Sequence, residues 1–397
     1  RASWGRVGNS QIANAYGSYD TFNPEIYGNT GGTVYSQAGN LNLGWETADQ
    51  TNVGLDLGFL NNRISLEANY YHKNHRELIL AVPQTPSKGV PGNSILMNVG
   101  AMYNKGFEFA LNVRAVERES FKWTTSLNFS TNKNMVTELD NEGRPLIATT
   151  AGLETTSITE VGKSAAQIYA VPTNGVNPEN GRRIFINKEG KEVQYVHNAP
   201  NSGGVFSYSY LDGSRASGVA GDAIALGNTL PTYFGGWNNN FQFGSFDATL
   251  NFTFSGGNYI YNGTRAGLRD QRIWNNSVDM LNAWTPDNRN SDVPRAVYGD
   301  NISNGSAFAI QSNIEKGDFL RLQTASLGYR LPSTLFGNSG ISSLRVYASV
   351  NNAFLITKYT GVDPEISSNG DGNLNSGVER NSIPNGRTFT FGINLGF

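Results

Sequence analysis

Hydrophobic and polar residues alternate along the chain in stretches of about ten residues. In 388–397 an aromatic or aliphatic residue takes every second position, and Thr, Gly or Asn takes the positions between. The same alternation occupies 246–254, 107–113 and 53–59. Successive side chains of a strand point to opposite faces, so each stretch predicts a strand with one apolar and one polar face. Extending the pattern predicts twelve strands, at 1–8, 45–59, 63–78, 102–116, 121–135, 165–172, 182–196, 229–243, 246–257, 317–331, 341–355 and 386–397.

The length of the alternation favours strands that cross a membrane. Strands of soluble sandwiches, which also alternate, average five or six residues, whereas a tilted bilayer crossing takes about 9–11. Several stretches here keep the pattern for nine residues or more. A polar face that carries Glu108, Asp247 and Arg330 suits a water-filled interior, and the apolar face suits lipid. The longest clean apolar run, 78–82, is too short for a membrane helix. We therefore expect an all-β, antiparallel transmembrane β-barrel rather than a sandwich.

The connections between these strands fall into two length classes. Tight hairpins rich in Asn, Ser or Gly join the strands at 60–62, 117–120 and 244–245. Outer-membrane barrels have short turns on the periplasmic side and long loops outside. If the chain end at 397 lies in the periplasm and the strands are counted backwards from it, all the short joins fall on the periplasmic side. The sequence thus predicts long extracellular loops near 9–44, 79–101, 136–164, 258–316 and 356–385.

Aromatic residues gather at the short-turn ends of the expected strands. Singly, each aromatic fits ordinary packing, but together they predict a membrane-interface girdle. Its expected members are Phe59, Phe121, Phe243, Phe246 and Tyr329, together with Phe397 at the last position.

Composition excludes several classes of function. The 397 residues include no Cys, so a disulfide framework, a thiolate metal site and a Cys nucleophile are excluded. The three His make a multi-histidine metal centre improbable, and a net charge of -2 gives no basic field for a nucleic acid. Charged residues make up 16%, below the roughly 25% of soluble domains. The first residues, Arg-Ala-Ser-Trp without Met, suggest an internal start.

Five motifs occur in the order and spacing of a known family. They are RASWGRVGN at 1–9, WET followed by FLNNRI within 45–64, NKGFE at 104–108, GDFLRL followed by LGY within 317–329, and RTFTFGINLGF at 387–397. With these motifs the chain resembles the SusC/RagA family of TonB-dependent outer-membrane transporters of Bacteroidetes. The resemblance extends over essentially the whole chain.

The resemblance implies a fold and a function. It implies a 22-stranded barrel filled by an N-terminal plug, of which this chain holds about twelve C-terminal strands, without the plug or the segment that engages TonB. Because an open sheet edge in lipid leaves backbone groups unpaired, further residues or a partner chain must complete the barrel.

By the same resemblance, the protein is a transporter in the outer membrane, in contact with lipid and lipopolysaccharide, and not an enzyme, and it needs no cofactor. It imports glycans or oligopeptides under a SusD-like surface lipoprotein lid, and the TonB complex supplies the energy. A passive porin and a structural or secretion-associated scaffold remain the alternatives.

Ligand contacts are expected from the long loop 258–316. Aromatic faces stack on sugar rings or peptide side chains, and Arg pairs with carboxylates. The alternative is that these residues pack the loops against one another or against the lid. The candidates are Tyr259, Tyr261, Arg265, Arg269, Arg272, Trp274, Trp284 and Tyr298. By resemblance, the terminal Phe397 is the signal for barrel assembly.

Three features resemble catalytic or metal sites only superficially. His72 and His75 lie three apart, which on a strand places them on opposite faces. The segment 177–191 lies where relatives carry a loop that resembles a calcium site. Here Asn187 stands in place of the first acidic residue and the segment contains lysines, which disfavours binding of a calcium ion. The segment 363–365, Asp-Pro-Glu, fits a turn better than catalysis. We therefore expect neither a catalytic residue nor a metal site.

Overall fold

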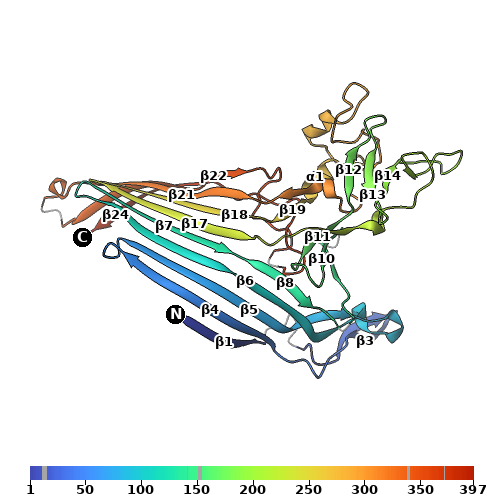
Figure 1. Ribbon diagram of the computed structural model, residues 1–397, viewed down its shortest axis with the longest axis horizontal. Coiled ribbons are helices and arrows are strands. Elements are labelled where there is room, and N and C mark those ends of the chain that lie inside the picture. Colours follow the sequence, from blue (N-terminus) through green and yellow to red (C-terminus); the bar gives the residue numbers. More distant parts are fainter. Residues whose placement is uncertain (11–15, 141, 151–153, 338–339, 371) are drawn as a thin grey trace.

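The structure is a computed structural model that describes residues 1–10, 16–140, 142–150, 154–337, 340–370 and 372–397. Parts of the loops expected at 9–44, 136–164 and 356–385, namely 11–15, 141, 151–153 and 371, lie outside the described residues. Figure 1 shows one long curved sheet, with folded connections gathered at one of its ends.

This long sheet, called the wall sheet below, has the strand order β1-β4-β5-β6-β7-β17-β18-β21-β22-β24, and β8 pairs with β6 beside β7. Each neighbouring pair is antiparallel, and β1 and β24 stand at the two ends of the order. The strands are β1 Ala2–Asn9, β4 Glu46–Phe59, β5 Ile64–Pro83, β6 Ser94–Glu117, β7 Phe121–Thr131, β8 Lys133–Glu138, β17 Tyr233–Phe243, β18 Phe246–Gly256, β21 Phe319–Arg330, β22 Ser343–Thr357 and β24 Thr388–Gly396. The expected all-β, antiparallel barrel wall is confirmed.

Strand register places the apolar residues of neighbouring strands on one face. Leu55 lies opposite Ala68, which lies opposite Phe109 on the next strand. Side chains of this face are exposed, and Phe391 on β24 retains 81% of its accessible surface. An exposed row of apolar side chains is what a lipid-facing surface requires. The alternation in the sequence therefore corresponds to an outer apolar face and an inner polar face.

The expectation of twelve strands in the wall is wrong for two segments, 165–172 and 182–196. β7 pairs directly with β17, so the wall skips everything between β8 and β17. The first segment holds the short strand β11, Gln167–Ala170, and the second holds β13 and β14, all in smaller sheets. Ile168, Phe185 and Val193 are fully buried there. An alternating pattern shows that one face is covered, but not what covers it.

The short turns lie at the end of the wall sheet away from the folded connections (Figure 1). Leu60, Asn61 and Asn62 all adopt positive φ values between β4 and β5, and Gly244 does so between β17 and β18. Asn and Gly tolerate this left-handed conformation, so these sequences favour tight reversals. One expected loop is shorter than predicted: within 79–101 the strands β5 and β6 continue to Pro83 and from Ser94.

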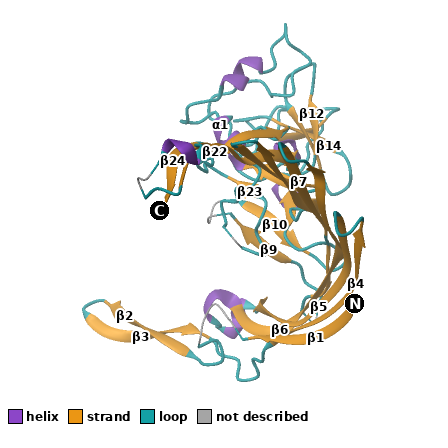
Figure 2. Ribbon diagram, turned by 90° about the vertical axis from the view of Figure 1, so that its left-hand side faces the viewer, coloured by secondary structure: helices purple, strands orange, loops and turns teal. Residues whose placement is uncertain are grey.

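Within the residues that the structure describes, the long connections form four smaller sheets. The inner sheet, with the order β16-β11-β10-β9, lies within the curve of the wall sheet (Figure 2). The cap sheet β12-β13-β14-β15 and the sheet β20-β19-β23 lie at the loop end, which is the end of the wall sheet opposite the short turns (Figure 1). The hairpin β2-β3 projects away from the wall sheet (Figure 2). Their bounds are β2 Thr21–Tyr27, β3 Thr30–Gln37, β9 Leu146–Thr149, β10 Thr155–Thr159, β11 Gln167–Ala170, β12 Thr173–Val176, β13 Arg183–Ile186, β14 Glu192–Tyr195, β15 Tyr208–Tyr210, β16 Ile224–Gly227, β19 Tyr259–Asn262, β20 Ile314–Lys316 and β23 Val378–Glu379.

Helical structure is confined to short pieces of the connections. In the part of the chain that the structure describes, no helix is both long and apolar enough to cross a membrane. The helices are α1 Gly263–Leu268 and 3-10 turns at Pro86–Lys88, Pro91–Asn93, Ala220–Asp222, Val278–Asn282, Gln311–Asn313 and Ser333–Leu335.

One motif glycine marks the place where β7 ends and β8 begins. A Cβ atom on Gly106 would lie 1.9 Å from the backbone oxygen of Thr131, so only glycine fits there. The Tyr71 hydroxyl donates to the same oxygen at 3.1 Å, and the Phe107 amide donates to the Thr131 hydroxyl at 2.9 Å. The NKGFE sequence therefore allows β6 to pair with two successive partners.

Candidate functional site at the loop end

Three connections that lie far apart in the sequence meet at β19. Tyr261 pairs with Ile314 of β20 on one side and with Val378 of β23 on the other. Ile168 and Ala170 of the inner sheet pack into the same buried cluster as Tyr261 and Val378. The connections 139–232, 258–316 and 358–385 therefore form one folded assembly, called the loop assembly below.

Three of the expected ligand residues hold the loop assembly together. Tyr261 is fully buried, its hydroxyl donates to the Gly305 carbonyl at 3.2 Å, and burial raises its pKa. Arg265 in α1 pairs with Glu315 at 2.8 Å. Burial lowers the pKa of Arg265, against the opposing effect of Glu315. Arg269 pairs with Asp279 at 2.5 Å. These contacts favour the packing alternative for all three residues.

Trp284 also makes a contact between loops. Its indole Nε1 donates to the Pro178 carbonyl at 3.0 Å. Its ring covers Gly181, where a Cβ atom would lie 2.4 Å from the ring. The positive φ of Gly181 places the backbone under this ring. Trp284 thus attaches the turn between β12 and β13 of the cap sheet to the loop 258–316.

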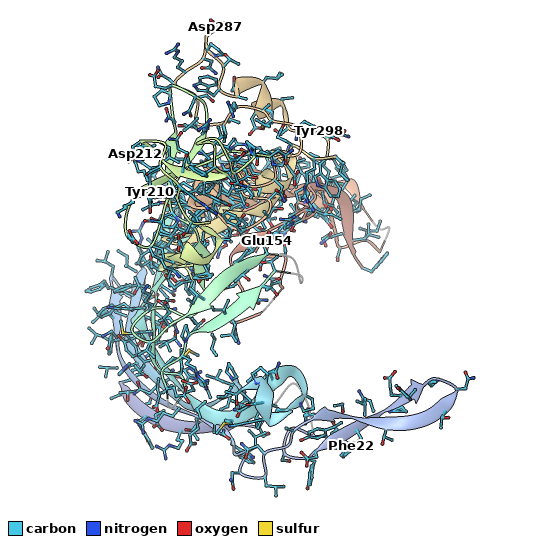
Figure 3. All side chains as sticks on the ribbon, turned by 90° about the vertical axis from the view of Figure 1, so that its right-hand side faces the viewer. Phe22, Glu154, Tyr210, Asp212, Asp287 and Tyr298 are labelled. Carbon is cyan, nitrogen blue, oxygen red and sulfur yellow. The ribbon has the colours of Figure 1, made fainter. Side chains whose placement is uncertain are left out.

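The other four candidates reach the surface of the loop assembly. Tyr298 is 83% exposed and Trp274 is 60% exposed, and Figure 3 shows Tyr298 at the outer edge. Tyr259 is partly exposed on β19. Arg272 is half exposed and pairs with the buried Asp270 at 2.6 Å. These four side chains remain predicted contacts for a ligand or a lid.

The Asp270 carboxylate joins two parts of the loop 258–316. Arg272 binds it through Nε and Nη2, and the Ser306 hydroxyl donates to it at 2.5 Å. Burial alone would raise the pKa of Asp270, but the hydrogen bonds from Arg272 and Ser306 hold it below its ordinary value. The aspartate therefore remains ionised in the folded loop at neutral pH.

A second buried charge cluster connects the wall sheet to the last long loop. The Arg321 side chain is 2% exposed and Asp363 is 3% exposed, and they pair at 2.6 Å. Arg321 also pairs with Glu365 at 2.7 Å and donates to Asn352. Asp363 additionally accepts from the Glu365 amide at 3.0 Å, as the expected turn requires. The sequence placed Arg321 in a family motif but gave no signal that its partner lies more than forty residues later.

A third buried pair ties the same loop to the inner sheet. Arg380 pairs at 2.6 Å with Glu154, whose side chain is 3% exposed. Glu379, fully buried, accepts from the Thr264 hydroxyl at 2.7 Å and from the Tyr359 hydroxyl at 3.3 Å. Burial, with the nearby charge of Glu379, raises the pKa of Tyr359. Buried charges at both ends thus fix the loop 358–385.

The buried Arg183 of the cap sheet was not anticipated from the sequence. Its guanidinium donates to the backbone oxygens of Ser303, Gly175 and Asp292 at 3.0, 3.3 and 3.1 Å. Burial lowers the pKa of Arg183 to about 10, so the side chain stays charged at neutral pH. It joins the cap sheet to the loop 258–316 by hydrogen bonds to carbonyls.

The residues that resembled metal sites make structural contacts instead. The His72 ring packs against Tyr103 with 5.6 Å between centroids, and the histidines lie on opposite faces of β5. In 177–191, Asn177 and Asn187 accept from backbone amides of their own turns. Among the described residues no group of three or more His, Asp or Glu could hold a metal ion.

The expected girdle aromatics form a row across neighbouring strands. Phe243 lies opposite both Phe121 and Phe246, and Phe246 lies opposite Tyr329. Ring centroids of Phe246 and Tyr329 lie 4.7 Å apart. Phe59 stands at the turn between β4 and β5 and is half exposed. A row of aromatics beside the short turns suits a membrane interface, and that location stays a prediction. Phe397, 87% exposed, follows β24, and its assembly role also stays a prediction.

Comparison with known proteins agrees with the motifs. Residues 1–177 match the family model described as TonB dependent receptor-like, beta-barrel. The TonB-dependent receptor P3 of Formosa agariphila is 32% identical over 410 residues, which cover 100% of this chain and 39% of that receptor. The TonB-dependent receptor SusC of Bacteroides thetaiotaomicron is 27% identical, covering 100% of this chain and 37% of SusC.

Solved structures give the same result. A chain of the RagAB peptide transporter superposes with a TM-score of 0.79 at 27% identity, covering 100% of this chain and 40% of that one. The RagAB peptide importer in its open-open state gives a TM-score of 0.77. The chain thus spans about two fifths of the length of the proteins it matches. Motifs, relatives and structures together identify this chain as a β-barrel portion of a TonB-dependent receptor of the SusC/RagA kind.

Proposed function

We propose that this chain forms part of an outer-membrane importer that carries glycans or oligopeptides into the periplasm. A SusD-like surface lipoprotein covers the loop end, lipid and lipopolysaccharide surround the apolar face, and the TonB complex supplies energy through residues outside this chain. The chain carries no catalytic role in this proposal, and the relatives are named as receptors and transporters.

The observation that carries the proposal is the asymmetry of the wall sheet, shared over the whole chain with a peptide transporter structure. Short turns stand at one end, and the loop assembly, held by buried charge pairs, stands at the other. A fixed assembly at the mouth of a wide barrel suits selective capture, because fixed loops hold ligand contacts in place without paying for their ordering.

Uptake by living cells tests this proposal against its two alternatives. Cells that carry or lack the gene receive labelled oligopeptides and, separately, labelled oligosaccharides, with and without a protonophore. An importer energised through TonB loses uptake both on gene deletion and on collapse of the proton gradient. Uptake that survives the protonophore identifies a passive porin. Unchanged uptake in the deletion strain, with loss of a surface complex, identifies a scaffold.

A fractionation experiment tests the location and the lid. The tagged full-length protein is expected in the outer-membrane fraction, and it should co-purify with one surface lipoprotein in equal amounts. Recovery in another fraction, or with a large multiprotein assembly, contradicts the proposal.

A further inference from the structure

The apolar run 78–82 lies beyond an irregularity in β5. The register between β5 and β6 shifts between His75 and Leu78, where β5 has an extra residue, and Glu77 adopts a φ of +56°. The register shifts again between Leu78 and Ile79, where the extra residue is on β6 and leaves the faces of β5 unchanged. Before the shift, even-numbered residues of β5 such as Tyr70 lie opposite Phe107 on the outer face. One extra residue in a strand sends the following side chains to the opposite face. Leu78 and Leu80 are therefore directed to the inner face.

Gly100 on β6 gives independent support for this reversal. It is an even-numbered residue seven positions from Phe107, so it belongs to the inner face. A Cβ atom on Gly100 would lie 3.0 Å from the Cβ of Leu78 and 2.8 Å from a Cδ of Leu80. Both leucines therefore cover Gly100 on the inner face of the wall sheet.

These leucines line a pocket of about 230 Å³ between the wall sheet and the inner sheet. Figure 2 shows the inner sheet inside the curve, facing the wall strands that supply the other side. The polar lining residues of the pocket are Glu46, Glu138, Thr159 and Asn373. Its larger apolar lining residues are Leu78, Ile79, Leu80, Met102, Val136, Leu139, Leu146 and Leu374.

Two of the polar lining residues are already engaged. The Glu46 carboxylate accepts from the Ile79 amide at 2.9 Å and from the Asn9 side chain at 2.8 Å. The Thr159 hydroxyl accepts from the Ala166 amide at 2.9 Å. The other two polar lining residues, Glu138 and Asn373, are exposed to solvent. Apolar residues form most of the lining, so an apolar group gains by leaving water for this pocket.

We propose that this pocket receives one aliphatic or aromatic side chain of an oligopeptide during import. The proposal rests on the proposed function and assigns a substrate class to it. The pocket is large enough for such a side chain, because apolar cavities of about 150 Å³ accept benzene in other proteins. The bulge in β5 thus moves Leu78 and Leu80, which would otherwise share the outer face with Tyr70, to the inner face.

The test uses the purified full-length complex and two synthetic nonapeptides that differ only in a central Leu or Ser. Titration should show the Leu peptide binding roughly tenfold more tightly, about half of what complete burial of a Leu side chain gives. Leu146→Asn should abolish this preference. The matched control is Ile147→Asn, because Ile147 is the next residue of β9, points to the other face and is 53% exposed. The control should keep the preference.

Leu146→Met separates lost folding from lost recognition, since it conserves apolar volume and should retain the preference. Equal affinity for the two peptides in the wild type overturns the proposal, as does a preference that persists in Leu146→Asn. If the complex binds neither peptide but cells still import a labelled oligosaccharide, the assignment of this pocket is wrong. The proposed importer function is then still supported. If wild-type cells show no energised uptake of either labelled compound, the proposed importer function itself is wrong.

Discussion

The buried pair of Arg321 and Asp363 predicts how firmly the last long loop is attached to the wall sheet. Arg321→Met removes the guanidinium and leaves Asp363, 3% exposed, with hydrogen bonds from Asn385 at 3.2 Å and from the Glu365 amide. Removing one partner of a buried ion pair costs about 3–5 kcal/mol, because the remaining charge has lost its compensation. The second partner, Glu365, is 39% exposed and can turn to water.

The assay is hydrogen exchange, measured by mass spectrometry on the full-length complex. At about 1.4 kcal/mol per tenfold, the change should speed exchange in peptides covering 359–368 by roughly 100-fold or more. The control is Arg345→Met in the wall sheet. Arg345 pairs with Asp247 at 2.5 Å, but both side chains are partly exposed, at 23% and 37%, so this pair contributes about 1 kcal/mol or less. Exchange in 359–368 should not change in the control.

A double variant, Arg321→Met with Asp363→Leu, completes the test. Replacing both members of a buried pair by apolar groups is often neutral, so exchange should slow again relative to the single variant. Unchanged exchange in Arg321→Met would refute the attachment argument. Faster exchange in the double variant than in the single one would show that the loop depends on Asp363 and not on the charge pair.

Three further predictions concern assembly, strand branching and pH. Phe397→Ser should lower the amount of protein in the outer membrane, and unchanged levels on fractionation would count against an assembly signal. Gly106→Val should destabilise the barrel by about 3 kcal/mol, read as a lower unfolding temperature, because its Cβ would meet the Thr131 oxygen. The lowered pKa of Asp270 means that its stabilisation is complete above the unfolded value near 3.8 and is lost as pH falls through the lower folded value. Exchange in 268–276, corrected for the intrinsic exchange rate at each pH, should therefore accelerate only below about pH 4, and Asp270→Asn should remove that pH dependence.

The wall sheet was largely readable from the sequence because its strands are long and regular. The alternation in 246–254 and 388–397 continues for more residues than a soluble strand needs, and Asn or Gly marks the tight turns. The motifs then indicated the family by their resemblance to it. The site was readable only in part, since Trp274 and Tyr298 reach the surface as a ligand contact requires, whereas Tyr261 is fully buried.

Short alternating segments were ambiguous for a physical reason. Alternation with a period of two shows that one face of a strand is covered, and either lipid or another sheet can cover that face. Phe185 and Val193 alternate like wall residues but are fully buried in the cluster beside Ile310. Part of their cover comes from Ile302, Phe308 and Ile310, more than a hundred positions later, which the local pattern cannot reveal.

The sequence by itself determined the class of fold, the direction of each long strand and the positions of the short turns, because these depend on local periodicity and on backbone preferences. Only the tertiary structure decided which segments leave the wall, which loop arginines are buried, and on which face Leu78 and Leu80 lie. Those outcomes depend on long-range contacts, such as Arg321 with Asp363, and on one extra residue near Glu77 that reverses the faces of a strand.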